Sequence, residues 1–263
     1  MSEHAKIEDL LAAAHDEGDL SAESLQALSV DADIGARIQA GLGILPDDVP
    51  ASEVLLVSMM PDDSGSIQAA HNEEAVRSGH NLVLEALRKS AQREDVLVHT
   101  RYLNGHTLCP YRLLRDAVEM TRQNYHANQG TPLYDQTVVL LGTVIAKYRQ
   151  FELSGVPART VTLLITDGAD VHSTQQTAAS VRSVVTDMLR MESHIVAAMG
   201  ISDKTTDFRR VFRDMGIPDQ WILTPGGTQS EVRKAFHAFS QSAVRLSQGK
   251  ASFSRAALGG FGN

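Results

Sequence analysis

Apolar residues follow two different spacings along most of the chain. Four short stretches are almost continuously apolar, which is typical of strands buried on both faces of a sheet. These predicted strands lie at residues 54–60, 161–165, 194–201 and 221–223. Between them, apolar residues recur at the spacing of amphipathic helices. The predicted helices span about 72–91, 131–154, 177–188, 208–215 and 232–246.

The alternation of strands and helices predicts the fold class. A strand, a helix and a second strand normally form a parallel pair joined by a right-handed crossover. Residues 95–102 alternate like a strand near a sheet edge, and the hairpin signal Asn104-Gly105 indicates a short antiparallel strand through Leu108. We therefore expect an α/β fold, a Rossmann-like, doubly wound, mostly parallel sheet with one antiparallel edge strand and helices on both faces. Residues 111–120 are expected to be helical.

The start of the chain differs from the rest in charge. Residues 1–53 contain twelve acidic side chains and only two basic ones, Lys6 and Arg37. Their apolar positions predict three short helices, and the proline-bounded stretch 46–50 is the predicted linker. We interpret residues 1–52 as an acidic helical extension. It either packs on the main domain as a collar or serves as an arm that docks a partner.

Residues 53–246 are predicted to form the main domain, and the segment 247–263 is a tail. The tail contains Gly249, Gly259, Gly260 and Gly262. Such a glycine-rich end predicts a flexible terminus, with an interaction peptide as the alternative.

Composition narrows the functional classes. The formal net charge is −8 and there is no basic stripe, which argues against nonspecific affinity for nucleic acid or for an anionic membrane. No apolar run reaches the length of a transmembrane helix, and the N-terminus lacks the pattern of a secretory signal. The single Cys109 excludes an intrachain disulfide framework. We therefore expect a protein of the reducing cytoplasm.

Oxygen-bearing side chains follow two of the predicted buried strands. Asp62, Ser64 and Ser66 form a D-x-S-x-S pattern after the first strand, and Asp167 comes directly after the second. In open α/β sheets, ligands bind beyond the carboxyl ends of the strands. Asp63 offers a second register for the pattern, but only Asp62 keeps the two-residue step to Ser64.

A third segment, Gly130-Thr131-Pro132, predicts a helix start with Thr131 as its N-cap. The candidate ligands are Asp62, Ser64, Ser66, Thr131 and Asp167. Five oxygen ligands without thiolate or imidazole suit a hard cation, Mg²⁺ first, with Mn²⁺ or Ca²⁺ as alternatives.

Together, the segments D-x-S-x-S, G-T-P-L-Y-D and I-T-D-G resemble the metal-ion-dependent adhesion site of von Willebrand factor A (vWA) domains of cytoplasmic bacterial type. The resemblance covers about residues 53–246, and Ile67 departs from the methionine that the family often has there. It implies that Ser64 and Ser66 coordinate the metal directly and that Thr131 does so directly or through water. The aspartates, Asp62 and Asp167, are implied to act mostly through water or behind the ligands.

Hydroxyl ligands add no negative charge, so the ion stays electrophilic and can accept a carboxylate from outside. We therefore expect a metal-dependent protein–protein interaction module whose partner supplies an aspartate or glutamate. No residue has an evident claim to be a general base, and no enzyme activity is expected. The resemblance also implies an AAA+ ATPase system as the partner.

Three other interpretations start from the same residues. A metal-dependent phosphohydrolase with Asp62 as nucleophile is the alternative function, but the loops contain no phosphate-binding lysine. The triplet Asp63-Ser64-Gly65 resembles that of aspartic proteases, which require a β-rich fold and a second triplet. A softer metal at His106 and Cys109, or at His172, would lack four converging nitrogen or sulfur ligands.

Overall fold

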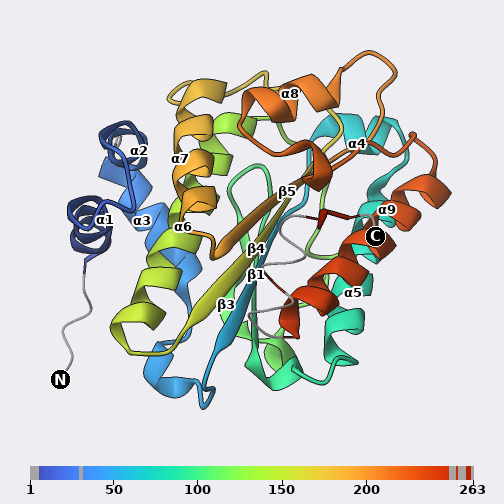
Figure 1. Cartoon of the computed structure of the whole chain (residues 1–263). Helices are drawn as coiled ribbons and strands as arrows, with labels where there is room; N and C mark the ends of the chain where they lie inside the picture. The colour runs from blue at the N-terminus through green and yellow to red at the C-terminus, as the bar shows by residue number, and fades with distance from the viewer. Residues whose placement is uncertain (1–5, 30–31, 249–252, 254–258, 262–263) are drawn as a thin grey trace.

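Six strands form one sheet in the order β3-β2-β1-β4-β5-β6 (Figure 1). The computed structural model describes residues 6–29, 32–248, 253 and 259–261. The strands are β1 (Val54–Met60), β2 (Val96–Arg101), β3 (Thr107–Leu113), β4 (Ala158–Thr166), β5 (His194–Gly200) and β6 (Ile222–Leu223). All neighbouring strands pair in parallel except β2 and β3, which are antiparallel. The predicted α/β fold class is therefore confirmed, including the antiparallel strand at the edge.

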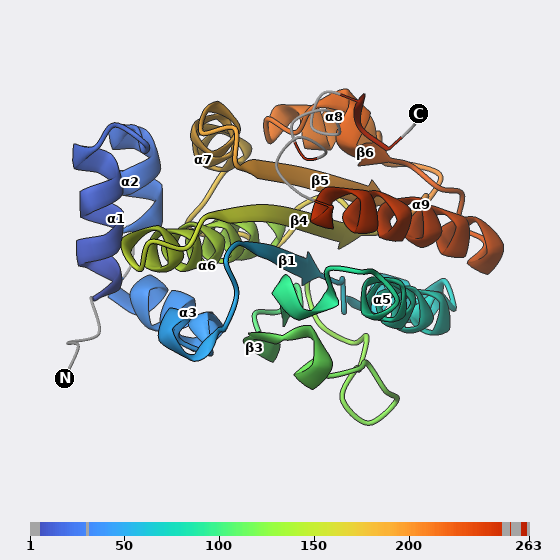
Figure 2. The same cartoon turned by 60° about the horizontal axis from the view of Figure 1, so that its bottom comes forward.

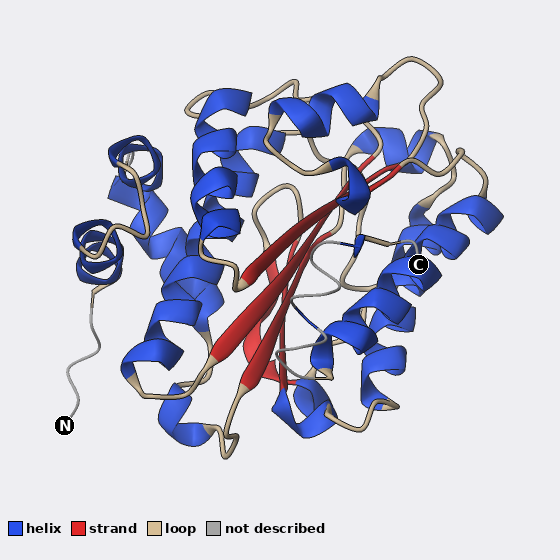
Figure 3. Cartoon of the chain, viewed as in Figure 1, coloured by secondary structure: helices blue, strands red, loops and turns tan. Residues whose placement is uncertain are grey.

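Every residue of β1, β4 and β5 is buried. Helices cover both faces of the sheet, as continuously apolar strands require. One face carries α6 (Leu133–Leu153) and α7 (Ala178–Arg190), and the other carries α5 (Glu73–Arg88) and α9 (Gln229–Ser247), as Figures 2 and 3 show. The shorter helical elements are α4 (Gly65–Ala69), α8 (Phe208–Asp214) and 3-10 turns at Pro46–Asp48, Arg93–Asp95, Leu114–Asp116 and Asp219–Trp221.

The N-terminal segment forms α1 (Ile7–Asp16), α2 (Ala22–Leu28) and α3 (Ala32–Leu42), which pack against α6 and α7 (Figure 2). Apolar side chains of all three helices belong to the same continuous core as the sheet. The approach is close, because a Cβ added at Gly142 of α6 would lie 2.7 Å from Ile38 Cδ1. The described part of the acidic extension is therefore packed against the main domain.

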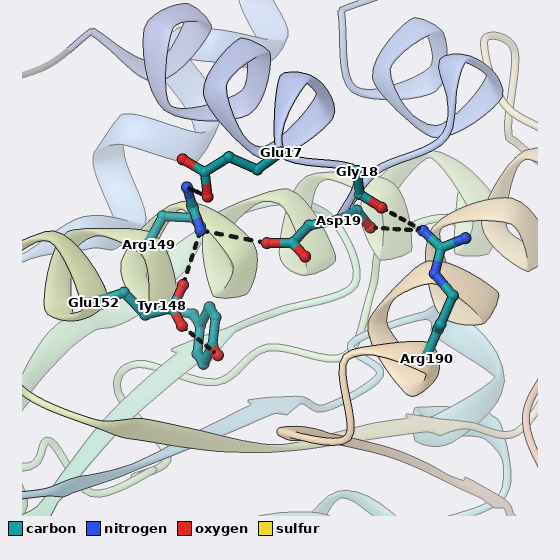
Figure 4. Close-up of polar contacts among 7 residues, drawn as sticks. All are labelled: Glu17, Gly18, Asp19, Tyr148, Arg149, Glu152 and Arg190. Carbon is teal, nitrogen blue, oxygen red and sulfur yellow. Dashed lines mark hydrogen bonds and ion pairs between the residues drawn. The ribbon is translucent and has the colours of Figure 1, made fainter.

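Charged groups line the rim of this contact (Figure 4). Arg149 of α6 is only 6% exposed and lies 2.5 Å from Glu17, 3.3 Å from Asp19 and 2.9 Å from Glu152. Arg190 of α7 donates to the backbone carbonyl of Asp19 over 3.2 Å. The turn between α1 and α2 is thus held by cations from two helices.

A second set of hydrogen bonds attaches the N-terminal segment to α7 at the start of α2. Ser21 is the N-cap of this helix, and its side chain accepts from the N–H of Ser24. Asp187 of α7 accepts from the N–H of Ser21 over 2.7 Å and from the hydroxyls of Ser21 and Ser24 over 2.6 Å each. These bonds hold the pKa of Asp187 below its usual value, although burial opposes them.

The helix predicted at residues 111–120 is wrong. Residues up to Leu113 continue β3, and only a 3-10 turn follows at Leu114–Asp116. Tyr111 is fully buried and its hydroxyl lies 2.5 Å from Ser58 of β1, while Leu113 pairs with Leu97 of β2. These tertiary contacts override a weak helical pattern, and Pro110 is tolerated because an edge strand has one unpaired side.

The tail prediction falls mainly on residues 249–252, 254–258 and 262–263, which lie outside the described part of the chain. Of the described tail residues, Phe253 is buried with its ring 5.6 Å from the guanidinium of Arg159. Phe261 packs edge-on against Trp221, with ring centroids 5.0 Å apart. Within the described chain, no helix combines the length and the apolar character needed to cross a membrane.

Candidate metal centre

Two loops meet at the carboxyl ends of β1 and β4. These strands are direct neighbours, and Met60 pairs with Leu164 at their ends. The loop that contains Asp62 therefore emerges beside the loop that contains Asp167. The helix α4 starts at Gly65, so Ser66 lies in its first turn. The sheet register alone brings the two distant motifs to one place.

Three oxygen atoms converge between these loops. Ser66 Oγ donates to Asp167 Oδ1 over 2.6 Å, and Ser64 Oγ lies 3.5 Å from the same oxygen. The two serine hydroxyl oxygens are 2.9 Å apart. Two hydroxyls and a carboxylate form a set of hard oxygen donors, which fits Mg²⁺, Mn²⁺ or Ca²⁺ better than a softer metal.

Asp62 lies behind this set and ties the two loops together. One carboxylate oxygen accepts from the N–H of Ser64 over 2.7 Å. The other accepts from the hydroxyl of Thr166 over 2.7 Å and from the N–H of Asp167 over 3.2 Å. Asp62 has no exposed surface, and burial raises its pKa although these hydrogen bonds favour the ionised form.

The neighbouring acid, Asp63, points to a different part of the molecule. Its Oδ1 accepts from the N–H of Asn104 in the β2–β3 hairpin over 3.0 Å. Burial, together with the charge of Asp62, raises the pKa of Asp63 to about 7. The geometry thus assigns Asp62, and not Asp63, to the cluster formed with Ser64 and Asp167.

Thr131 reaches the same region through its backbone, but it is not the N-cap of α6. The helix begins at Leu133 with Pro132 as N-cap, one residue later than predicted. Gln129 forms a parallel bridge with Ser64, so Thr131 follows two residues after a direct contact with the serine loop. Thr131 is 7% exposed, and its N–H donates to His172.

The site concentrates negative charge. Burial raises the pKa of Asp167 to about 6, and the charge of Asp62 acts in the same direction against the hydrogen bond from Ser66. A divalent cation at the converging oxygens would favour the ionised carboxylates. In the chain as described, no three Asp, Glu, His or Cys side chains gather into a possible metal site.

Several residues that shape the site lie outside the motifs visible in the sequence. Thr166 bonds Asp62, and Tyr125 donates its hydroxyl to the backbone carbonyl of Asp62. His172 was considered only as a ligand for a softer metal, whereas its Nδ1 accepts from Thr131. The position of Thr166 beside Asp167 could have suggested its role. The contributions of Tyr125 and His172 depend on loops whose paths the sequence does not specify.

No protein-family model matches the sequence, and no curated protein matches it either. Among solved structures, the pilus adhesin SpaC from Lactobacillus rhamnosus GG is similar with a TM-score of 0.53 and 12% identity, over 73% of this chain and 30% of that chain. The shared property is the fold. The likeness covers less than a third of the adhesin, and at this identity it concerns the arrangement of strands and helices alone.

Two further solved structures are similar to this chain with lower TM-scores. Proximal thread matrix protein 1 from the mussel byssus has a TM-score of 0.48 and 14% identity, over 74% of this chain and 48% of that chain. A von Willebrand factor type A protein from Catenulispora acidiphila has a TM-score of 0.47 and 15% identity, over 74% of this chain and 43% of that chain.

Proposed function

We propose that the chain is a vWA-type protein-interaction module that recognises a carboxylate of a protein partner through Mg²⁺. Ser64 and Ser66 provide hydroxyl ligands, Thr131 does so directly or through water, and Asp62 and Asp167 act mostly through water or from behind the ligands. The observation that carries this proposal is the convergence of Ser64 Oγ, Ser66 Oγ and Asp167 Oδ1 at the ends of β1 and β4.

The chemistry of the donors supports recognition of an acid. Serine and threonine hydroxyls are neutral, so a divalent ion held mainly by them keeps much of its positive charge. Held in this way, a divalent ion would attract a carboxylate oxygen of the partner. The chain's own residues orient the hydroxyls. Asp62 fixes the loops after β1 and β4 to each other by accepting hydrogen bonds from Ser64, Thr166 and Asp167.

The hydrogen bonds of Asp62 disfavour the phosphohydrolase alternative. A nucleophilic aspartate needs a carboxylate oxygen that can approach phosphorus. Both oxygens of Asp62 already accept hydrogen bonds from Ser64, Thr166 and Asp167, and the side chain has no exposed surface. An attack would require these bonds to break, with a cost of about 1–3 kcal/mol for each buried donor left without a partner.

The identity of the partner follows only from the family resemblance. An AAA+ ATPase system is the partner that this resemblance suggests, and its recognised feature would be an aspartate or glutamate side chain. The cytoplasmic location belongs to the same proposal and rests on the lone Cys109, which is buried as a free thiol.

The test is metal-dependent stabilisation of the folded chain. Saturating Mg²⁺ should raise the melting temperature, because it binds the folded state selectively. The double variant with Ser64→Ala and Ser66→Ala should lose this shift. Ser78→Ala is the control and should keep it, because Ser78 is a half-buried residue of α5 whose hydroxyl donates to the carbonyl of Ala75 in the same helix. An unchanged metal response in the double variant would rule out the site.

A further inference from the structure

The backbone of residues 129–131 spans the gap between two loops of the candidate site. At one end, Gln129 donates its N–H to the carbonyl of Asp63 and accepts from the N–H of Gly65, each over 3.0 Å. These bonds attach it to the loop that contains the two serines. At the other end, Thr131 is attached to the loop that follows β4. Thr131 is therefore held from both sides by its backbone.

His172 makes the attachment at the second end. The N–H of Thr131 donates to His172 Nδ1 over 2.8 Å, and its carbonyl accepts from the N–H groups of Val171 and His172 over 3.2 and 3.3 Å. The imidazole of His172 also lies against Gly130, the residue before Thr131. A Cβ added at Gly130 would be only 2.9 Å from His172 Nδ1. A glycine at this position gives the ring the room that its hydrogen bond requires.

The same loop also satisfies the free N–H groups at the start of α6. Pro132, the N-cap, provides no side-chain acceptor. Instead, the N–H of Tyr134 donates to Asp170 over 3.2 Å, and the N–H of Asp135 donates to Ser173 over 3.0 Å. In return, the Asp135 carboxylate accepts from three successive N–H groups at residues 174–176. The two segments thus cap each other.

We propose that His172 is a positioning residue for the metal centre, which fixes the Thr131 hydroxyl relative to Asp167. This inference rests on the proposed function, since it assumes a cation at the oxygen cluster. Residues that orient metal ligands from behind typically change metal affinity 10- to 100-fold when they are replaced. His172 is exposed at the surface, so its replacement leaves the core intact.

The experiment compares three variants of the full chain by calorimetric titration with Mg²⁺ and with Mn²⁺. His172→Leu removes the acceptor at nearly constant size. His172→Asn restores an acceptor, because the amide oxygen of asparagine occupies the place of imidazole Nδ1. Thr177→Ala is the matched control, because it removes the N-cap acceptor of α7 from the same loop without contacting Thr131.

We expect His172→Leu to weaken metal binding at least tenfold and His172→Asn to remain within threefold of the wild type. Thr177→Ala should lower the melting temperature of the metal-free protein but leave metal affinity unchanged. Amide hydrogen exchange of Thr131 in the metal-free protein supplies a second measurement. Its N–H should lose protection in His172→Leu and keep it in His172→Asn.

Equal affinities for wild type and His172→Leu would overturn the positioning role and leave the proposed function intact. A loss of affinity shared by Thr177→Ala would also overturn it, because loop stability alone would then explain the effect. Absence of metal binding by the wild type would overturn both proposals together. Gly130→Ala offers an independent check, since its methyl group would displace the imidazole and should weaken binding as His172→Leu does.

Discussion

The carboxylate of Asp62 accepts a hydrogen bond from the backbone N–H of Asp167 over 3.2 Å, although the two residues are 105 positions apart in sequence. This bond, with a second one to the hydroxyl of Thr166, fixes the loop after β4 to the loop after β1. Because the two loops carry the converging oxygens, Asp62 holds the parts of the site in their relative positions.

Asp62→Asn should therefore weaken Mg²⁺ binding about 10- to 100-fold. Asparagine keeps one acceptor oxygen but places an NH2 group at the other position, so one of the two loops loses its acceptor and its donor faces another donor. The adjacent change, Asp63→Asn, is the control, because Asp63 faces Asn104. Its effect on Mg²⁺ affinity should be several-fold smaller. Calorimetric titration at constant ionic strength measures both, and equal losses would contradict the assignment of Asp62.

Arg149→Met should destabilise the protein by about 1–2 kcal/mol at low salt. The variant keeps the aliphatic stem but leaves Glu17, Asp19 and Glu152 close together without their shared cation. Since these acids are partly exposed, the loss should shrink when salt screens their repulsion. Urea unfolding at low and high salt measures the difference. Arg190→Met, which removes a more exposed cation, should cost less, and the reverse order would contradict this account.

Gly43→Ala should be among the more damaging single changes, with a loss above about 2 kcal/mol. Gly43 has φ +58°, and a Cβ there would lie 1.9 Å from the carbonyl oxygen of Tyr111. The backbone of α3 would have to withdraw from β3. At Gly35 the added methyl would meet only the mobile end of Glu8, at 3.0 Å. Gly35→Ala should therefore cost much less, and similar melting temperatures for the two variants would argue against a firmly packed extension.

Stability should rise with pH above neutrality because of Lys147. Burial lowers the pKa of this lysine to about 7, from an ordinary value of 10.5. Between these values the unfolded chain binds more protons than the folded one, so raising the pH favours folding. The free energy of unfolding should therefore increase between pH 7 and pH 9.

The matching variant is Lys147→Met, which keeps the length of the side chain and cannot be protonated. Its free energy of unfolding should change with pH less steeply than that of the wild type, by on the order of 1 kcal/mol per pH unit. Urea unfolding at pH 7, 8 and 9 provides the measurement. Parallel pH profiles for the two proteins would show that Lys147 does not titrate in this range.

Glycines in the N-terminal extension illustrate a limit of sequence reasoning. Nothing in the local sequence around Gly41 and Gly43 explains why glycine is needed at these positions. In the structure, a Cβ at Gly41 would lie 2.6 Å from Thr143 and 3.0 Å from His99. Both glycines permit close contact between α3 and the main domain, and a local pattern cannot report a contact with residues that are far away in sequence.

Local patterns in the sequence predict the class of sheet and most of its strands and helices, with the exception of residues 111–120 and the short helix α4. Periodicity is a local property, and continuously apolar runs require burial on both faces wherever they lie. The sequence also placed Asp62, Ser64, Ser66 and Asp167 directly after two such strands. Because parallel strands end at the same edge, their meeting followed once β1 and β4 were neighbours.

The remaining features depend on tertiary contacts. In the structure, β3 continues to Leu113 where a helix was expected, since burial of Tyr111 and pairing with β2 outweigh a weak local preference. The structure also shows that His172, 41 residues beyond Thr131, holds the third segment of the site. The direction of Thr131 depends on hydrogen bonds between irregular loops, and such bonds have no periodic signature in the sequence.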